Sequence, residues 1–507
     1  MLPQAVGGLY LDVSRASLEP STISATFDMG HRVALDRRLL LTTLIGCLLF
    51  LWPLLVYGRP GDFQDSAAYY KGGRMAVSFA LEKLHLQAPA PIAAPAPPAA
   101  AAGSAASLPA QDPQQVRGAR SVAYSVAAYV LGAPRPQMWL LVAAQALATA
   151  FMCAVALLLF GDGLRGTSAK LAALAVLTPV AFVACVIVPD VFAGLVILVI
   201  ALLAAAYRSL SPGVRITSIL IGGAGITFHA SHLPVGLGVT ALAAAWLLWG
   251  SRGRIPVPRG QWVALAGPVL LGAALTVGLN SVAFGGPSLT GKRYPLTLAR
   301  SVAEGPAKWY LDKNCGSLKY AICEVYPHGV PGTINSFLWG KNGVKERATA
   351  EQLDRIRAEE SDVVLAATRA YPFQEIGRLA FNFGRQLVLF RPGVGLDARI
   401  VIDQEGNPAS EPASYNRTWV RAVGILSIAG MIASLALLFV RWRSMPQLRP
   451  LIMLVVLGIF LNACICVYFS GVTDRYQARV IWLIPLLALM AMQPGGRPAA
   501  NPGGSQA

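Results

Sequence analysis

The sequence predicts an all-α polytopic membrane protein with about ten transmembrane helices. It also predicts a small, mostly helical extracytoplasmic domain inserted before the last three spans. Of the 507 residues, 55% are hydrophobic and only 13% are charged, and the mean hydropathy is +0.54. Several apolar runs approach the roughly 20 residues that cross a bilayer as a helix. These runs are continuous and do not alternate with polar residues, which favours helices over a β-barrel.

The net charge of +17 suits a membrane protein whose basic residues orient its spans and meet anionic lipids. The sequence shows no interleaved basic and aromatic surface of the kind that binds nucleic acid, so we expect no nucleic-acid partner. Five cysteines lie inside apolar runs and are expected to be small core residues: Cys47, Cys153, Cys185, Cys464 and Cys466.

The first span, residues 39–57, follows a basic cluster that includes Arg37 and Arg38. Positive residues stay on the cytoplasmic side, so we expect a cytoplasmic N-terminus in the cell inner (plasma) membrane. No small-residue cleavage site follows the run, so it is expected to remain as an anchor and not to act as a cleaved signal.

A short apolar run at 121–131 determines the sidedness of everything after it. We interpret it as an interfacial helix and not as a span. The later spans are then expected at 138–160, 171–188, 191–207, 216–228, 233–249, 262–279, 420–439, 451–469 and 480–492. The short cytoplasmic loops between them are basic, whereas Arg475 and Arg479 break the rule on the outer side. Arginines that oppose the orientation rule are candidates for function.

This topology divides the chain into five parts. They are a cytoplasmic segment (1–38), a transmembrane bundle (39–279) with a first outer loop (58–137), an extracytoplasmic domain (280–418), the C-terminal spans (419–492) and a cytoplasmic tail (493–507). The outer loop contains an Ala/Pro-rich insert at 87–113 that is expected to be a disordered linker. Within the domain, amphipathic helices are predicted at 346–370 and 374–390, and the second of these is suited to lie on the membrane.

Two carboxylates, Asp62 and Asp65, follow the first span in the stretch GRPGDFQDSAAYY. If this loop is helical, both can lie on one face. Two close carboxylates can hold a divalent cation, or act as a base and its orienting partner. The alternative is a solvated loop in which an aspartate caps the helix that begins near Ser66.

Polar residues also interrupt the next two outer hinges. Asp190 lies in VIVPDVFAGL between two apolar runs, where it could face a site or cap the following helix. His229 and His232 lie three residues apart in FHASHLPVG. Because two histidines alone make a poor metal site, we expect them to bind phosphate or a sugar hydroxyl, or to bond backbone carbonyls freed near Pro234.

Arg120 and Tyr124 begin the interfacial helix, and Arg475 and Arg479 precede the last span in TDRYQARVIW. Guanidinium groups match phosphate oxygens, so these residues are predicted to bind substrate. The alternatives are contacts with lipid headgroups and, for Arg475, a local pair with Asp474.

Cys315 and Cys323 lie eight residues apart in the outer domain, an oxidising compartment, so a disulfide is predicted. The sequence contains no Walker loop, GxSxG elbow, HExxH, CxxC or dinucleotide fingerprint.

The layout of the first 250 or so residues resembles the GT-C superfamily of integral-membrane glycosyltransferases. The residues that carry the resemblance are Asp62 and Asp65 after the first span, Arg120 and Tyr124 in RSVAY, and Asp190 at an outer hinge. The insert at 87–113 and a domain placed between spans depart from the superfamily pattern.

The resemblance implies an inverting sugar transfer from a polyprenyl-phosphate donor at the extracytoplasmic face, to a glycan, lipid or protein acceptor. It implies that Asp62 or Asp65 is the base, or holds a divalent cation, and that the arginines stabilise the leaving phosphate. Two alternatives stay open: a lipid-linked polysaccharide polymerase or ligase, and a non-enzymatic transporter or envelope assembly protein. A transporter would favour charges at mid-membrane and paired repeats, neither of which the sequence shows.

Overall fold

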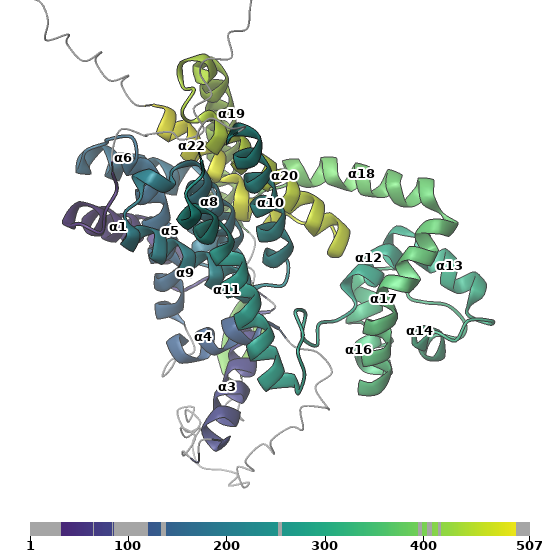
Figure 1. Ribbon diagram of the computed structural model, residues 1–507. Coiled ribbons are helices and arrows are strands. Elements are labelled where there is room, and N and C mark those ends of the chain that lie inside the picture. Colours follow the sequence, from purple (N-terminus) through teal and green to yellow (C-terminus); the bar gives the residue numbers. More distant parts are fainter. Residues whose placement is uncertain are drawn as a thin grey trace, which may run out of the picture.

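The computed structural model describes residues 32–63, 65–83, 85, 120–132, 138–251, 256–393, 398–402, 408–413 and 417–492. Their regular structure is almost entirely helical, as the sequence predicts (Figure 1). The Ala/Pro-rich insert, the tail and most of the N-terminal segment lie outside the described residues.

Six helical segments are long and apolar enough to cross a membrane, judged by length and composition. They are α1 (Arg37–Phe50) with α2 (Trp52–Tyr57), α5 (Trp139–Leu158), α10 (His232–Ser251), α11 (Arg259–Phe284), α19 (Arg417–Arg441) and α20 (Arg449–Phe469). These six match expected spans and support a helical membrane protein.

The other four expected spans are shorter helices, so the number of ten spans remains a prediction. They correspond to α6 (Leu164–Leu177) with α7 (Val180–Ala184), α8 (Val191–Ala205), α9 (Pro212–Phe228), and α21 (Asp474–Ile481) with α22 (Leu483–Ala491). Pro179 separates α6 from α7, because proline supplies no backbone N–H to continue the helix. Short 3₁₀ turns follow α8 at Tyr207–Ser209 and α19 at Trp442–Ser444. The predicted interfacial helix is α4 (Val122–Gly132).

Helix α8 lies at the centre of the bundle, where every one of its residues is buried. This explains its uniformly apolar sequence, since a helix without a polar face has no side suited to water. Gly194 lets α21 approach closely: a Cβ at this position would lie 2.8 Å from the carbonyl oxygen of Arg479. The start of α8 and the middle of α21 are therefore held side by side.

The inserted domain consists of α12 (Leu296–Glu304), α13 (Pro306–Asn314), α14 (Ala321–Val325), α15 (Ile334–Leu338), α16 (Val344–Arg347) and α17 (Ala350–Ala370). It has a hydrophobic core of its own, which includes Leu298, Phe337 and Leu353. The predicted disulfide between Cys315 and Cys323 is confirmed, with a Cα–Cα distance of 5.1 Å.

Helix α18 (Pro372–Val388) runs from this domain back to the bundle (Figure 1). At its start, Glu375 forms a buried ion pair with Arg300 of α12, with Oε1 and Nη2 2.6 Å apart. At its other end, the Gln386 amide exchanges two hydrogen bonds with the backbone of Thr473, at 2.9 and 3.0 Å. A hairpin of β1 (Ala398–Ile402) and β2 (Pro408–Pro412) follows and packs beside α3 (Ser66–Lys83).

Candidate functional site

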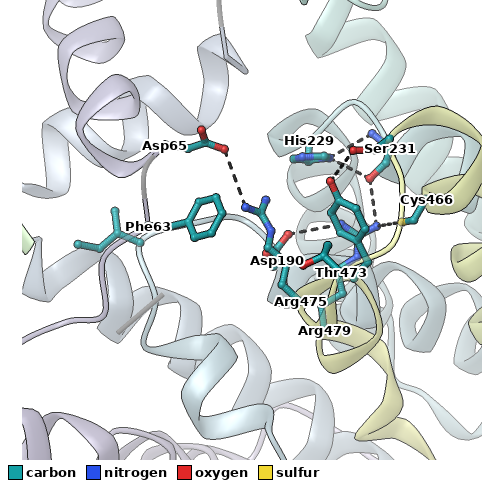
Figure 2. Close-up of polar contacts among 12 residues, drawn as sticks. Phe63, Asp65, Asp190, His229, Ser231, Cys466, Thr473, Arg475 and Arg479 are labelled. Atoms are coloured by element: carbon teal, nitrogen blue, oxygen red, sulfur yellow. Dashed lines mark hydrogen bonds and ion pairs between the residues drawn. The ribbon is translucent and has the colours of Figure 1, made fainter. Parts of the chain in front are cut away.

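Charged side chains from four segments distant in sequence meet near the start of α8, and Figure 2 shows Asp65, Asp190, Arg475 and Arg479 among them. We call the following five residues the charged cluster: Asp65, Arg120, Asp190, Arg475 and Arg479. Four of them lie just before, or early in, α3, α4, α8 and α21, and Arg479 lies one turn after Arg475 on α21. The sequence singled out all five, and the structure brings them together.

Arg475 joins the two carboxylates of the charged cluster. Its Nε lies 2.8 Å from Asp190 Oδ2, and its Nη1 lies 3.9 Å from Asp65 Oδ2. The shorter contact is an ion pair whose angles fall outside those of a hydrogen bond. Arg120 forms a second ion pair with Asp65, through the other carboxylate oxygen, Oδ1. Arg475 forms no ion pair with Asp474, whose carboxylate accepts a hydrogen bond from the Arg391 backbone N–H.

Asp190 occupies the N-cap position of α8, but its side chain makes no capping hydrogen bond. The carboxylate instead lies between Arg475 and Arg479, whose Nη1 is 3.4 Å from Oδ1. Asp190 is only 3% exposed, and a buried carboxylate needs charged or hydrogen-bonding partners such as these. Of the two roles considered for Asp190, the structure therefore favours the one that faces the charged cluster.

Arg479 is fully buried and is held mainly by neutral groups. Asn462 Oδ1 accepts hydrogen bonds from its Nε and Nη2, at 3.1 and 2.8 Å. Ser231 Oγ and Cys466 Sγ also lie within 3.1 Å of Nη2. Sequence reasoning missed Asn462 and Ser231. The available signal was Asn462 itself, a polar residue within the apolar run of α20, where an unpartnered amide is costly.

The charged cluster borders a recess whose empty volume, open solvent included, is about 320 Å³. Its lining includes Asp190, Arg475, Phe63, Val188 and Arg391. The Phe63 ring lies under the Arg475 guanidinium, with its centroid 4.3 Å from Cζ. This stacking holds the planar group while leaving its edges for polar partners.

The charged cluster carries an excess of positive charge. It contains three guanidinium groups and two carboxylates, a difference of one. The neighbouring His229 adds no charge, because burial lowers its pKa well below the ordinary value, with His232 and Arg479 adding to the effect. One uncompensated guanidinium beside a recess favours an anionic ligand such as a phosphate.

The two histidines contact a backbone carbonyl and a serine hydroxyl. His232 Nδ1 lies 2.7 Å from the Gly225 carbonyl oxygen, which is in the last turn of α9 and has no later helical N–H to accept from. His229 Nδ1 lies 2.9 Å from Ser231 Oγ, which in turn contacts Arg479. Among the residues the structure describes, no group of three His, Cys, Asp or Glu side chains is arranged to hold a metal ion.

Asp62 lies apart from the charged cluster. The loop is extended here, because the Gly61 backbone pairs with Cys185 and Ile187, so the two acids do not share a helical face. Asp62 is 2% exposed, and its Oδ1 has no hydrogen-bond partner within the described chain. Burial raises the pKa of Asp62 to about 6, although the Ser66 hydroxyl opposes the shift.

Tyr124 is fully buried, and its hydroxyl donates a 2.8 Å hydrogen bond to Gln145 Oε1. The Gln145 amide donates to the carbonyl oxygens of Ala184 and Val186, in the segment that leads to Asp190. In this conformation Tyr124 therefore supports, through Gln145, the segment that leads to Asp190. Ser121, beside Arg120, similarly donates to the Thr227 carbonyl at the end of α9.

No protein-family model, curated protein or solved structure matches this chain.

Proposed function

We propose that the protein is a membrane glycosyltransferase that moves a sugar from a polyprenyl-phosphate donor to an acceptor at the extracytoplasmic face. The observation that carries the proposal is the charged cluster, in which Asp65 is ion-paired with Arg120 and with Arg475, and Arg475 lines a recess. A base next to a phosphate-binding group is what this reaction requires.

In the proposed reaction, Asp65 takes the proton from an acceptor hydroxyl. The hydroxyl oxygen attacks the anomeric carbon of the sugar with inversion, and the bond between that carbon and the phosphate oxygen breaks. Negative charge then develops on the leaving phosphate, where Arg475 and Arg120 would stabilise it. Their side chains keep 10% and 34% exposure, so both remain within reach of a ligand.

Arg479 and Asp190 have a different proposed role. Arg479 is fully buried and Asp190 nearly so, which suits positioning of Arg475 better than contact with substrate. Asp65 is favoured over Asp62 as the base because its side chain is 17% exposed and forms ion pairs with Arg120 and Arg475, whereas Asp62 is 2% exposed and forms no ion pair with either arginine.

Asp65→Asn should abolish transfer, with a loss of at least roughly a hundredfold, because the amide cannot accept the proton. Surface glycans and lipid-linked intermediates would be compared by mass spectrometry in cells without the gene and in cells complemented with each variant. The carrier-linked sugar should accumulate in the Asp65→Asn cells as it does in the deletion.

Asp62→Asn is the matched control, and it should restore transfer to within about tenfold of the natural protein. Full restoration by Asp65→Asn would contradict the assigned base. If Arg475→Gln alone then abolished glycan assembly, the polymerase or ligase alternative, which needs no acid at this position, would take its place.

A further inference from the structure

A second recess lies away from the charged cluster, between α12, α18 and the turn at 471–472. Its empty volume, open solvent included, is about 770 Å³. The polar part of its lining consists of Glu304, Arg378, Asn382 and Arg385. None of these residues lines the first recess.

The second recess contains two arginines that form no salt bridge with any residue the structure describes. Arg378 and Arg385 are seven residues apart on α18, so they project from the same side of the helix. Both are exposed, and neither forms a salt bridge with a carboxylate of the described chain. The acid in the recess, Glu304, is already engaged by Arg300 and Asn382, each at 2.7 Å. The recess is therefore suited to an anionic group.

The other side of α18 is apolar and exposed. Phe373 and Ile376, about 120° or more around the helix from both arginines, are 86% and 62% exposed. Phe383 lies against Phe460 of α20, with ring centroids 6.0 Å apart. Phe460 is nine residues from the end of a candidate span, or about 13 Å along the helix axis. The apolar side of α18 therefore packs against a candidate membrane span.

We propose that α18 lies in the membrane surface and that the second recess binds the phosphate of an anionic membrane lipid through Arg378 and Arg385. A helix with aromatic and aliphatic residues on one side and arginines on the other is typical of membrane-surface helices. Anionic headgroups supply the phosphate at the depth of the arginine side. This site is separate from the proposed transferase chemistry and does not depend on it.

Native mass spectrometry of the full chain in detergent would test the site, with phosphatidylglycerol and phosphatidylcholine of identical acyl chains as probes. The natural protein should retain phosphatidylglycerol at least tenfold more strongly than phosphatidylcholine. Arg378→Gln/Arg385→Gln should lose this preference, and because neither side chain is buried or ion-paired, its thermal unfolding should be unchanged.

Lys341→Gln/Arg369→Gln is the matched control, since it removes the same charge from exposed positions outside the recess. It should keep the preference. Equal retention of phosphatidylglycerol by the natural protein and Arg378→Gln/Arg385→Gln would overturn the site. Displacement of the lipid by an equal concentration of inorganic phosphate would overturn the lipid as its ligand, since a free anion would then suffice.

Discussion

Asp62 and Asp65 are three residues apart, yet their surroundings differ. Asp65 has two guanidinium partners, whereas Asp62 is buried against a paired loop with one carboxylate oxygen left without a hydrogen bond in the described chain. Spacing alone could not separate them, because the divergence comes from a backbone bridge between Gly61 and Val186, more than a hundred residues away in sequence.

The pKa of Asp62 predicts how stability depends on pH. The folded-state pKa of about 6 lies above the ordinary value of 3.8. Between these two pH values the folded protein therefore holds a proton on Asp62 that the unfolded chain releases. Stability from this group is present below about pH 4 and is lost as the pH rises through 6. The shift of about two units corresponds to roughly 3 kcal/mol.

Asp62→Asn should therefore unfold at nearly the same temperature as the natural protein at pH 4 and at a higher temperature at pH 7. Thermal unfolding of both proteins in the same detergent at several pH values would measure the difference. A gap that stays constant from pH 4 to 7 would show that Asp62 titrates normally.

At the scale of elements, close packing positions the site. Gly194 lets α21 lie against α8, and this brings Arg479 to the carboxylate of Asp190. Gln386 on α18 holds the backbone of Thr473, two residues before Arg475. The inserted domain is thus connected through α18 to the segment that carries Arg475 and Arg479.

The disulfide joins the end of α13 to α14 and closes a short loop within the domain. Cys315→Ser/Cys323→Ser should destabilise the domain by about 2.5 kcal/mol, because the unfolded loop gains freedom. Hydrogen exchange of the backbone amides in α12–α17 should become correspondingly faster. Cys464→Ser, which removes a free thiol from α20, is the control and should leave this exchange unchanged. Equal protection in the disulfide variant would contradict the prediction.

At the level of the whole molecule, the members of the charged cluster must all lie on the same side of the membrane, because they are in contact with one another. The basic loops of the sequence predict that this side is extracytoplasmic. The inserted domain shares it, since α18 ends beside the same segment.

Cysteine labelling would test this sidedness. Lys341 lies exposed in the domain, and Ser444 lies exposed beyond α19, a candidate span. A membrane-impermeant maleimide should label Lys341→Cys in intact cells, and should label Ser444→Cys only after the membrane is opened. Labelling of both positions in intact cells would contradict a span at α19, and the reverse pattern would place the charged cluster on the cytoplasmic side.

The helical membrane class, the disulfide and the candidate residues can be predicted from the sequence, because they follow from local properties: apolar run length, charge beside each run and cysteine spacing. The sequence also indicates that Arg475 and Arg479 are candidates for function, since they oppose the rule that basic residues stay on the cytoplasmic side. Contacts in the folded chain were needed to show that Asp65 joins the charged cluster and Asp62 does not. They were also needed to show that Asn462 holds Arg479 and that Tyr124 supports, through Gln145, the segment that leads to Asp190. Those outcomes depend on contacts between segments far apart in the chain, which side-chain spacing along one segment does not encode.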